Sequence, residues 1–580
     1  MLAVIGGLAI VTVLLGGAMI IGARFGKGVV GADTVLEVDF EQAILEDAPD
    51  DPLVELITGK GVVVRDVVEA LERAGQDTRV KGLVARVGAA PMGVAQVQEL
   101  RDAVAAFRAA GKWTVAYAET FGEFGPGNGA YYLASAFEEI YLLPSGDVGL
   151  TGIMYESMFL RGTLEKLGLA PRMDHRKEYK NAMNTFTESA YTEAHREAMQ
   201  KVMDSQFAQM VHGVAAARSL TDAQVRGLFD RGPYLGKEAV TAQLVDGVAY
   251  RDEVYEKVEA KTGATPSYLA LGAYLERAGR PHQKGETIAL VYGLGGVQRG
   301  RSGYDPVFGD VTMGSDTVAG ALRKAVKDDD VKAILFRVDS PGGSYVASDA
   351  IWRETVRAKQ AGKPVIVSMG NVAGSGGYFV AMAADKIVAQ PGTITGSIGV
   401  LGGKMLTAGL WEKVGVSWDE VHSSANARMW SGTHDYSPEE WARFQGWLDR
   451  VYEDFTGKVA DGRGLSRDKV QQIAKGRIWS GEDAKSLGLV DELGGFPVAL
   501  RLAREAAGLA PDAPVRLKVF PERKTLLQAL IERESGQPSE SAALAARTLS
   551  ALQPLMRDAR RLGLTPYRGE LAMPPWGQVW

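Results

Sequence analysis

The chain has 580 residues, of which 46% are hydrophobic and 23% are charged, as is typical of a folded globular protein. It contains no cysteine, which excludes thiol nucleophiles, thiolate metal sites and disulfides. Its six histidines form no ligand spacing such as H-E-x-x-H, so neither a metal nor a cofactor is predicted. A net charge of −6 gives no reason to expect nucleic acid as a partner.

The first 21 residues carry no charged side chain and predict a membrane-spanning helix. As a helix this run would be about 31 Å long, close to the hydrocarbon thickness of a bilayer. A cleaved signal peptide is the alternative, but its apolar region is normally shorter and follows a basic start. We therefore predict an uncleaved anchor at 1–22. Arg24 and Lys27 follow it, and by the positive-inside rule alone they would place the body of the chain in the cytoplasm.

An internal repeat organises the rest of the chain. VKGLVARV at 80–87 matches VKAILFRV at 331–338, an offset of 251 residues. GAYYLASA at 129–136 matches GGYFVAMA at 376–383, an offset of 247 residues. Such matches keep their order along the chain with a slowly drifting offset, which indicates a duplication with small insertions and deletions.

Both copies have the pattern of an α/β unit. In the second copy, short apolar runs rich in Val and Ile predict buried strands at 288–293, 333–339, 364–370 and 386–391. Segments with helical spacing lie between them, at 316–328 and 346–363. This alternation implies βαβ units and a largely parallel sheet. A longer helix is predicted at 436–464, with Ser437 as its N-cap.

These features divide the chain into four parts. We predict an anchor at 1–22, a first repeat at 33–280, a second repeat at 284–510 and a tail at 511–580. The tail ends in a Pro-rich, aromatic stretch that has no counterpart in the first repeat. It is predicted to be a packing arm or a flexible end; the alternative is a segment that docks in a groove or on a neighbouring subunit.

Two glycine-rich turns in the second repeat have the residues that acyl chemistry needs. Ser-Pro-Gly-Gly-Ser at 340–344 follows a predicted strand, and its glycines let backbone N–H groups face a concave site. Ser375 lies in Gly-Ser-Gly-Gly at 374–377, between a predicted strand and a predicted helix. This is the setting of a nucleophile elbow with an exposed hydroxyl, although a helix N-cap serine is the simpler alternative.

The two repeats differ at these positions. Asn128 of the first repeat takes the position of Ser375, and asparagine is a poor nucleophile. The first repeat has instead a cluster of charged residues at 175–181, which includes Lys180. A lysine can activate a serine when burial lowers its pKa. The pattern therefore predicts that Lys180 of one repeat meets Ser375 of the other.

A histidine is the rival base. His422 and His434 both follow Ser375 in the chain, which allows a Ser-His-Asp arrangement with an unidentified acid. Neither histidine stands in a motif-like setting, and His434 precedes a predicted helix, where a surface position is expected. Lysine is the preferred base.

Taken together, the motifs resemble the long form of the signal peptide peptidase A family, which comprises membrane-anchored serine proteases of the Clp/crotonase-like superfamily. The matching stretches are SPGGS at 340–344, GSGGY at 374–378, TGSIGV at 395–400 and YKNA at 179–182. The resemblance covers roughly residues 33–500 and the anchor. It implies a tandem duplication of a ββα-spiral domain preceded by one transmembrane helix.

The resemblance also implies roles for individual residues. Ser375 would be the nucleophile, Lys180 the general base, and Ser397 the residue that hydrogen-bonds the lysine. Gly343 and the N–H of Gly376 would form the oxyanion hole. The sequence departs from the family pattern at Gly374, where alanine is frequent, at Asn181, where serine is found, and in its long tail.

At the level of the whole protein, the resemblance implies an endopeptidase that degrades cleaved signal peptides and other hydrophobic peptides. It implies a homotetramer in the bacterial inner membrane, with a single span and the body facing the periplasm. Two other functions are weighed against it: a crotonase-like acyl-CoA enzyme and a non-catalytic peptide-binding scaffold. The predicted span, the serine and the duplication disfavour an acyl-CoA enzyme. A non-catalytic scaffold is disfavoured because the second repeat retains every group expected of the site.

Overall fold

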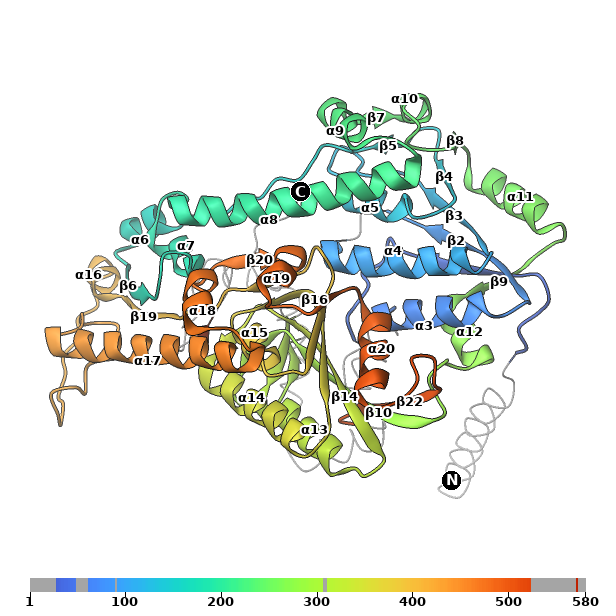
Figure 1. The fold of residues 1–580 in the computed structure, drawn as a ribbon. Helices are drawn as coiled ribbons and strands as arrows, with labels where there is room; N and C mark the ends of the chain where they lie inside the picture. Colours follow the sequence, from blue (N-terminus) through green and yellow to red (C-terminus); the bar gives the residue numbers. More distant parts are fainter. Residues whose placement is uncertain (1–27, 48–60, 89–90, 306–309, 523–569, 572–580) are drawn as a thin grey trace, which may run out of the picture.

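The computed structural model describes residues 28–47, 61–88, 91–305, 310–522 and 570–571. The predicted anchor at 1–22 lies outside these residues and stays a prediction. Within the described ranges, no helix is long and apolar enough to cross a membrane. Figure 1 shows two sheets with their helices, one from each predicted repeat, packed against each other.

A six-stranded sheet forms the centre of the first repeat. Its strand order is β8-β4-β3-β2-β1-β9, and all its pairings are parallel. Its strands are β1 (Thr34–Asp39), β2 (Val80–Arg86), β3 (Trp113–Ala118), β4 (Glu139–Leu142), β8 (Gly247–Val248) and β9 (Ser267–Ala270). The helices are α3 (Val64–Gly75), α4 (Val94–Ala109), α5 (Asn128–Ala134), α6 (Arg161–Leu167), α7 (Asn184–Thr187), α8 (Glu193–Arg218), α9 (Asp222–Arg231), α10 (Gly236–Thr241), α11 (Arg251–Thr262) and α12 (Leu271–Ala278). Outside this sheet lie β5 (Asp147–Val148), β6 (Ala170–His175), β7 (Tyr234–Leu235) and the 3-10 helix η1 (Asn181–Met183).

An eight-stranded sheet forms the centre of the second repeat. Its main path is β20-β18-β16-β14-β10-β22, with β17 paired to β16 and β21 to β17. Its strands are β10 (Glu286–Leu294), β14 (Val331–Ser340), β16 (Val365–Gly374), β17 (Lys386–Ala389), β18 (Ile394–Gly396), β20 (Ile478–Ser480), β21 (Glu492–Leu493) and β22 (Val515–Phe520). The helices are α13 (Ser315–Lys327), α14 (Tyr345–Gln360), α15 (Gly376–Ala381), α16 (Ala408–Lys413), α17 (Pro438–Arg463), α18 (Arg467–Ile473), α19 (Gly481–Leu487) and α20 (Phe496–Ala506).

A smaller sheet lies beside the second one. It has the order β12-β13-β11-β15-β23. Its strands are β11 (Gly296–Gln298), β12 (Gly303–Asp305), β13 (Asp310–Gly314), β15 (Gly343–Ser344) and β23 (Glu570–Leu571). The pairing of β23 with β15 is antiparallel, so a described piece of the predicted tail joins this sheet.

The strand orders confirm the duplication. The series β9-β1-β2-β3-β4-β8 in the first sheet has the same connectivity as β22-β10-β14-β16-β17-β21 in the second. The strand that corresponds to β9 is β22 (Val515–Phe520), so the second sheet extends past residue 510 into the predicted tail. The apolar runs became buried parallel strands, because a sheet covered on both faces leaves no position for alternating polar residues.

The predicted long helix is α17 (Pro438–Arg463). Its N-terminus is a capping box, in which the Ser437 hydroxyl accepts the Glu440 N–H and the Glu440 carboxylate accepts the Ser437 N–H. Pro438 occupies the first turn, where no intrahelical N–H bond is lost. Phe455 and Val459 on its inner face are buried in the core of the second repeat.

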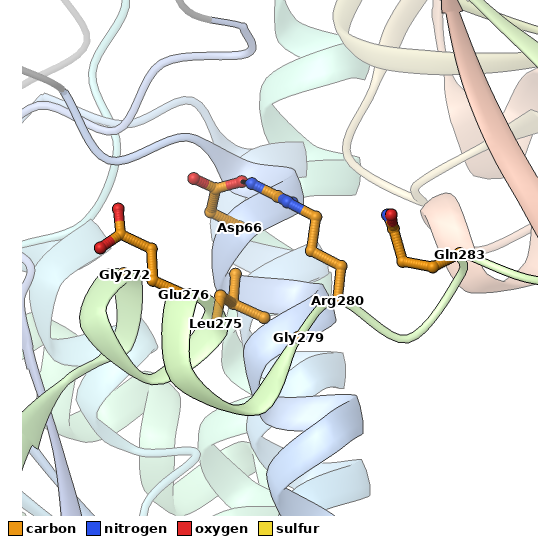
Figure 2. Close-up of a pocket in the computed structure, with 7 residues that line it drawn as sticks. All are labelled: Asp66, Gly272, Leu275, Glu276, Gly279, Arg280 and Gln283. Carbon is orange, nitrogen blue, oxygen red and sulfur yellow. Dashed lines mark hydrogen bonds and ion pairs between the residues drawn. The ribbon is translucent and has the colours of Figure 1, made fainter. Parts of the chain in front are cut away.

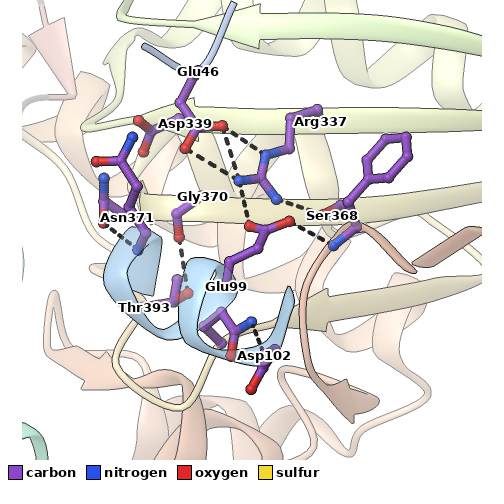
Figure 3. A network of polar contacts seen from close by, with 12 residues as sticks. Glu46, Glu99, Asp102, Arg337, Asp339, Ser368, Gly370, Asn371 and Thr393 are labelled. Atoms are coloured by element: carbon purple, nitrogen blue, oxygen red, sulfur yellow. Dashed lines mark hydrogen bonds and ion pairs between the residues drawn. The ribbon is translucent and has the colours of Figure 1, made fainter. Parts of the chain in front are cut away.

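The repeats are joined by strand pairing and by buried polar contacts. The strand β6 (Ala170–His175) of the first repeat pairs antiparallel with β19 (Leu401–Leu406) of the second. Figure 3 shows a second junction, where Arg337 of β14 bonds Glu99 of α4 at 2.8 Å and Glu46 at 2.9 Å. In Figure 1, α8 extends from the first repeat across β20, and Ser205 on it bonds Ser480 at 2.9 Å. The repeats are thus held in one arrangement at several places.

Candidate active site

Ser375 lies at a sharp turn between strand β16 and helix α15. Its φ of 55° and ψ of −116° form a conformation that is costly for a residue other than glycine. The turn is held by the Ser375 N–H, which donates to the Gly396 carbonyl at 2.8 Å, and by the Phe379 N–H, which donates to the Ser375 carbonyl at 2.9 Å. The predicted elbow geometry is therefore present.

The prediction that the Ser375 hydroxyl is exposed is wrong. The residue is 0% exposed, because the chain around Lys180 of the first repeat packs over the turn. The environment of the hydroxyl is correspondingly of low polarity, which strengthens every electrostatic interaction within it.

Lys180 reaches Ser375 from the other repeat. It follows β6 and immediately precedes η1, and its side chain is 1% exposed. Its Nζ lies 2.8 Å from Ser375 Oγ and 3.0 Å from both the carbonyl oxygen and the Oγ of Ser397. A neutral amine has two N–H donors and one lone pair. Two bonds to Ser397 would use both donors and leave the lone pair to accept the Ser375 hydroxyl proton.

Burial controls the protonation of this lysine. Removal from water lowers the pKa of Lys180 from 10.5 to about 7, because the low-dielectric surroundings disfavour the ammonium form. The described part of the chain offers Lys180 no carboxylate within ion-pair distance that would restore the charge. Near neutral pH a substantial fraction of the amine is therefore unprotonated and can act as a base.

Ser397 is held in place from the second repeat. It follows β18 and has a φ of 51°. Its N–H donates to the carbonyl of Arg477 at 2.7 Å. Its carbonyl and its hydroxyl are thereby both directed at Lys180 Nζ, as the resemblance implies for this position.

The two predicted oxyanion-hole glycines lie against each other. A Cβ atom on Gly376 would lie 3.0 Å from the Gly343 nitrogen and 2.7 Å from Ser348 Oγ. Gly343 has a φ of 149°, and a Cβ there would lie 2.2 Å from the Val297 carbonyl oxygen. Only glycine allows this approach, which brings two backbone N–H groups next to Ser375.

The corresponding site of the first repeat is filled by Asn128. Its Oδ1 accepts the N–H groups of Thr151 at 2.9 Å and Gly152 at 3.1 Å, and its Nδ2 donates to the Gly152 carbonyl at 2.8 Å. The side chain thus ties two loops together with all its polar atoms engaged. This is a structural role, in keeping with the predicted loss of the nucleophile from this copy.

The rival histidines lie elsewhere. His434 Nε2 is 2.7 Å and His422 Nδ1 is 3.6 Å from the carboxylate of Glu420, and their side chains are 38% and 42% exposed. Ser375 is buried and its Oγ contacts Lys180. The structure thus brings Lys180, and neither of these histidines, to the serine.

One cavity among the described residues is separate from the serine, the lysine and these histidines. It measures about 270 Å³ and lies at the junction of the repeats, beside α3 and α12 (Figure 2). Arg280, which lines it, is paired with Asp66 at 2.5 Å and with Glu69 at 2.6 Å. Among the described residues, no three His, Asp or Glu side chains are grouped so that they could hold a metal ion.

Sequence reasoning missed one part of the site. Lys475, Gly476 and Arg477 form a turn between α18 and β20 that lies against Lys180 and Ser397. The only available signal was a glycine between two basic residues, which predicts a turn but not which other segments of the chain the turn contacts. Contacts between segments roughly 300 residues apart in the sequence have no local signature.

Comparison with known proteins gives the family. The sequence matches Peptidase family S49 twice, over residues 106–265 and 357–510. Protease 4 of Salmonella typhi is 33% identical over 483 residues, which cover 81% of this chain and 76% of that protein. Protease 4 of Haemophilus influenzae is 32% identical over 474 residues, which cover 78% of this chain and 74% of that protein.

A plant protein is related over a similar span. The chloroplastic serine protease SPPA of Arabidopsis thaliana is 30% identical over 480 residues, covering 81% of this chain and 70% of that protein. Neither an acyl-CoA enzyme nor a non-catalytic scaffold agrees with these relatives, so both alternatives are set aside. With a family match in each repeat and relatives that cover most of its length, the chain belongs to peptidase family S49 and is a serine protease.

Proposed function

We propose that this serine protease is an endopeptidase in which Ser375 and Lys180 form a Ser-Lys dyad. The observation that supports the proposal best is the 2.8 Å contact between Lys180 Nζ and Ser375 Oγ, two buried groups from different repeats. A buried lysine lowers the stability of a fold unless it is paired with an acidic group, so an unpaired one indicates a functional role. Here it is unpaired with any described carboxylate and directed at a serine on a strained turn.

The proposed acylation step uses the neutral amine of Lys180. It accepts the hydroxyl proton as Ser375 Oγ attacks the peptide carbonyl carbon, and the oxygen of the tetrahedral intermediate is stabilised by the N–H groups of Gly343 and Gly376. The Lys180 ammonium then donates its proton to the leaving amine as the C–N bond breaks. The product is an acyl-enzyme ester on Ser375 and a free amino terminus.

Deacylation repeats the same proton transfers with water. Lys180, neutral again, accepts a proton from a water molecule that attacks the ester, and its ammonium returns the proton to Ser375 Oγ as the ester bond breaks. Ser397 bonds the amine in both steps. It would orient the lone pair of Lys180 towards the reacting hydroxyl or water.

We also propose that the substrates are cleaved signal peptides and other hydrophobic peptides. A putative signal peptide peptidase SppA of Enterococcus faecium is 38% identical over 173 residues, which cover 30% of this chain. The uncharged run at residues 1–21 supports an inner-membrane anchor. The periplasmic position proposed for the body follows from the family resemblance, since Arg24 and Lys27 alone would place it in the cytoplasm. Exposed apolar side chains at Trp418, Val421 and Trp430 support a contact surface between subunits, and the four subunits of the proposed homotetramer follow from the family resemblance. Membrane fractionation tests the anchor, and light scattering of the detergent-solubilised protein tests the homotetramer.

The dyad is tested with Ser375→Ala and Lys180→Ala in the full chain. Each is expected to lower kcat on casein or a synthetic signal peptide by at least about a thousandfold, because the nucleophile or its base is lost. A fluorophosphonate probe should label the wild type and not Ser375→Ala. His434→Ala is the matched control and should keep activity. Full activity of either dyad variant, with native circular dichroism, would rule the dyad out.

A further inference from the structure

The turn formed by Lys475, Gly476 and Arg477, called the 475–477 turn below, bonds to both sides of the proposed dyad. The Ser397 N–H donates to the Arg477 carbonyl at 2.7 Å, and the Gly476 N–H donates to the Ile398 carbonyl at 2.7 Å. On the other side, the Tyr179 N–H donates to the Lys475 carbonyl at 3.1 Å. Three main-chain bonds thus join the Lys180 segment of the first repeat to the Ser397 segment of the second through one turn.

Gly476 is in direct contact with the backbone of Lys180. A Cβ on Gly476 would lie 2.6 Å from both the nitrogen and the Cβ of Lys180, and 2.7 Å from its Cα. Gly476 has a φ of 79°, and its neighbour Lys475 has a φ of 56°. On the facing segment, a Cβ on Gly399 would lie 3.2 Å from Lys180 Cδ. The lysine is therefore packed between two glycines that leave no space for any side chain.

Side chains close the turn onto the first repeat. The Arg477 guanidinium lies 4.9 Å from the centroid of the Tyr179 ring and 4.3 Å from that of a Trp479 ring. It also pairs with Glu197 of α8 at 2.6 Å. Lys475 pairs with Glu178 at 3.2 Å. Both residues that precede Lys180, Glu178 and Tyr179, are thus bound by the two basic residues of the turn.

We propose that the 475–477 turn is a positioning element for the dyad, and that Gly476 and Arg477 keep Lys180 Nζ within reach of Ser375 Oγ. The inference rests on the proposed function. Lys180 Nζ is held by hydrogen bonds to Ser375 and Ser397 and by no described ion pair. The geometry of these bonds depends on where the backbone and the aliphatic stem of Lys180 are held. A displacement of about 1 Å at a catalytic group can reduce the rate on the order of a hundredfold.

Gly476→Ala is the first test. The methyl group would push the Lys180 backbone away, so we expect kcat to fall by between about tenfold and a hundredfold while KM changes by less than about twofold. The acid limb of the kcat profile should move to higher pH, because a displaced amine is better hydrated and keeps its proton longer. The fluorophosphonate labelling rate should fall in parallel with kcat.

Gly464→Ala is the matched control. Gly464 also has a left-handed φ, 62°, but no atom lies within 4 Å of the position of its Cβ. It ends α17 in the same repeat, so the substitution has the same backbone strain without the contact to Lys180. Equal kcat, equal pH limb and equal labelling rate in the two variants would overturn the proposal.

Arg477 gives a second test that leaves the main chain unchanged. Arg477→Met should lower kcat severalfold and shift the same pH limb, because the contact of the guanidinium with the ring of Tyr179, the residue before Lys180, is lost. Arg477→Lys keeps a cation beside the rings and should recover most of the activity. If both variants behave alike, or if Arg477→Met changes only the melting temperature, Arg477 is structural and not a positioning residue.

The pH limb can be assigned because the charged groups next to Lys180 have other partners. Glu178 pairs with Lys475, and Arg477 pairs with Glu197. The Lys177 ammonium lies 5.9 Å from the centroid of the Tyr452 ring. Glu197→Gln is the check on this assignment and should leave the limb near its wild-type position. The two proposals also fail separately. If Lys180→Ala retains activity, the proposed dyad is wrong. If Lys180→Ala loses activity but Gly476→Ala behaves like the wild type, only the proposed positioning role is wrong.

Discussion

At the scale of the residue, the proposed chemistry depends on the protonation of one side chain, Lys180. Lys180 is buried and hydrogen-bonded to two serines, and burial lowers its pKa to about 7. The amine is therefore a usable base at a pH where an exposed lysine, with a pKa near 10.4, would be almost fully protonated. Its partner Ser375 needs only its position on the strained turn.

This pKa predicts the pH dependence of the reaction. Below about pH 7 Lys180 gains a proton and cannot accept another, so kcat/KM should fall about tenfold per pH unit on the acid side. Above that pH the rate should reach a plateau. The measurement is kcat/KM from pH 5 to 10 on an uncharged peptide, with the fluorophosphonate labelling rate as a second readout. A limb near pH 10 would contradict a neutral, buried Lys180.

At the scale of the element, the helix α4 (Val94–Ala109) joins the repeats through a buried polar face. Gln98 Oε1 accepts the Gly392 N–H at 2.7 Å, and the Gln96 N–H donates to Asn371 Oδ1 at 2.9 Å. Glu99 accepts from Arg337 at 2.8 Å and from the Phe496 N–H at 2.7 Å. Each of these partners belongs to the second repeat. The N-terminal half of a helix that looks half-polar in sequence, residues 95–100, is thus buried throughout.

Glu99→Gln should therefore destabilise the protein. Of the carboxylate partners of Arg337 in the described part of the chain, it leaves Glu46 alone. Arg337 is 3% exposed, and disturbing a buried ion pair costs about 3 kcal/mol. We expect lower urea and thermal midpoints, measured by circular dichroism. Glu165→Gln is the control: it removes an exposed pair with Arg161 on α6 and should change these midpoints little. Equal midpoints in the two variants would contradict a stabilising junction at α4.

At the scale of the whole molecule, duplication has divided one site between two copies. The second repeat keeps Ser375, and the first holds Lys180 and has Asn128 at the position of the serine. Strand β6 pairs with β19 and carries the lysine across the junction. In this structure both members of the proposed dyad belong to the same chain.

A complementation experiment tests this arrangement. If the dyad forms within one chain, mixing or co-expressing full-length Ser375→Ala with full-length Lys180→Ala should restore no activity, because neither chain holds both groups. Wild type co-expressed with either variant is the positive control. Recovery of more than a few per cent of wild-type kcat in the mixed variants would show that the groups can meet between chains.

The sequence by itself determined the elements and the candidate dyad. Apolar runs and helical spacing are local patterns, and they predicted the strands β10, β14, β16 and β17 and the helix α17, which the structure confirms. Comparison of the two copies singled out Ser375 and Lys180, because each is present where the other copy lacks it. Their catalytic roles stay predictions until the variants are measured.

Only the tertiary structure decided how these groups are arranged. The burial of Ser375, the lowered pKa of Lys180 and the contact of Gly476 with the lysine backbone all depend on segments roughly 200 to 300 residues apart. The position of β22 beyond residue 510 was likewise set by pairing with β10. Local sequence encodes backbone preference and polarity, whereas desolvation and close packing arise only when two distant surfaces meet.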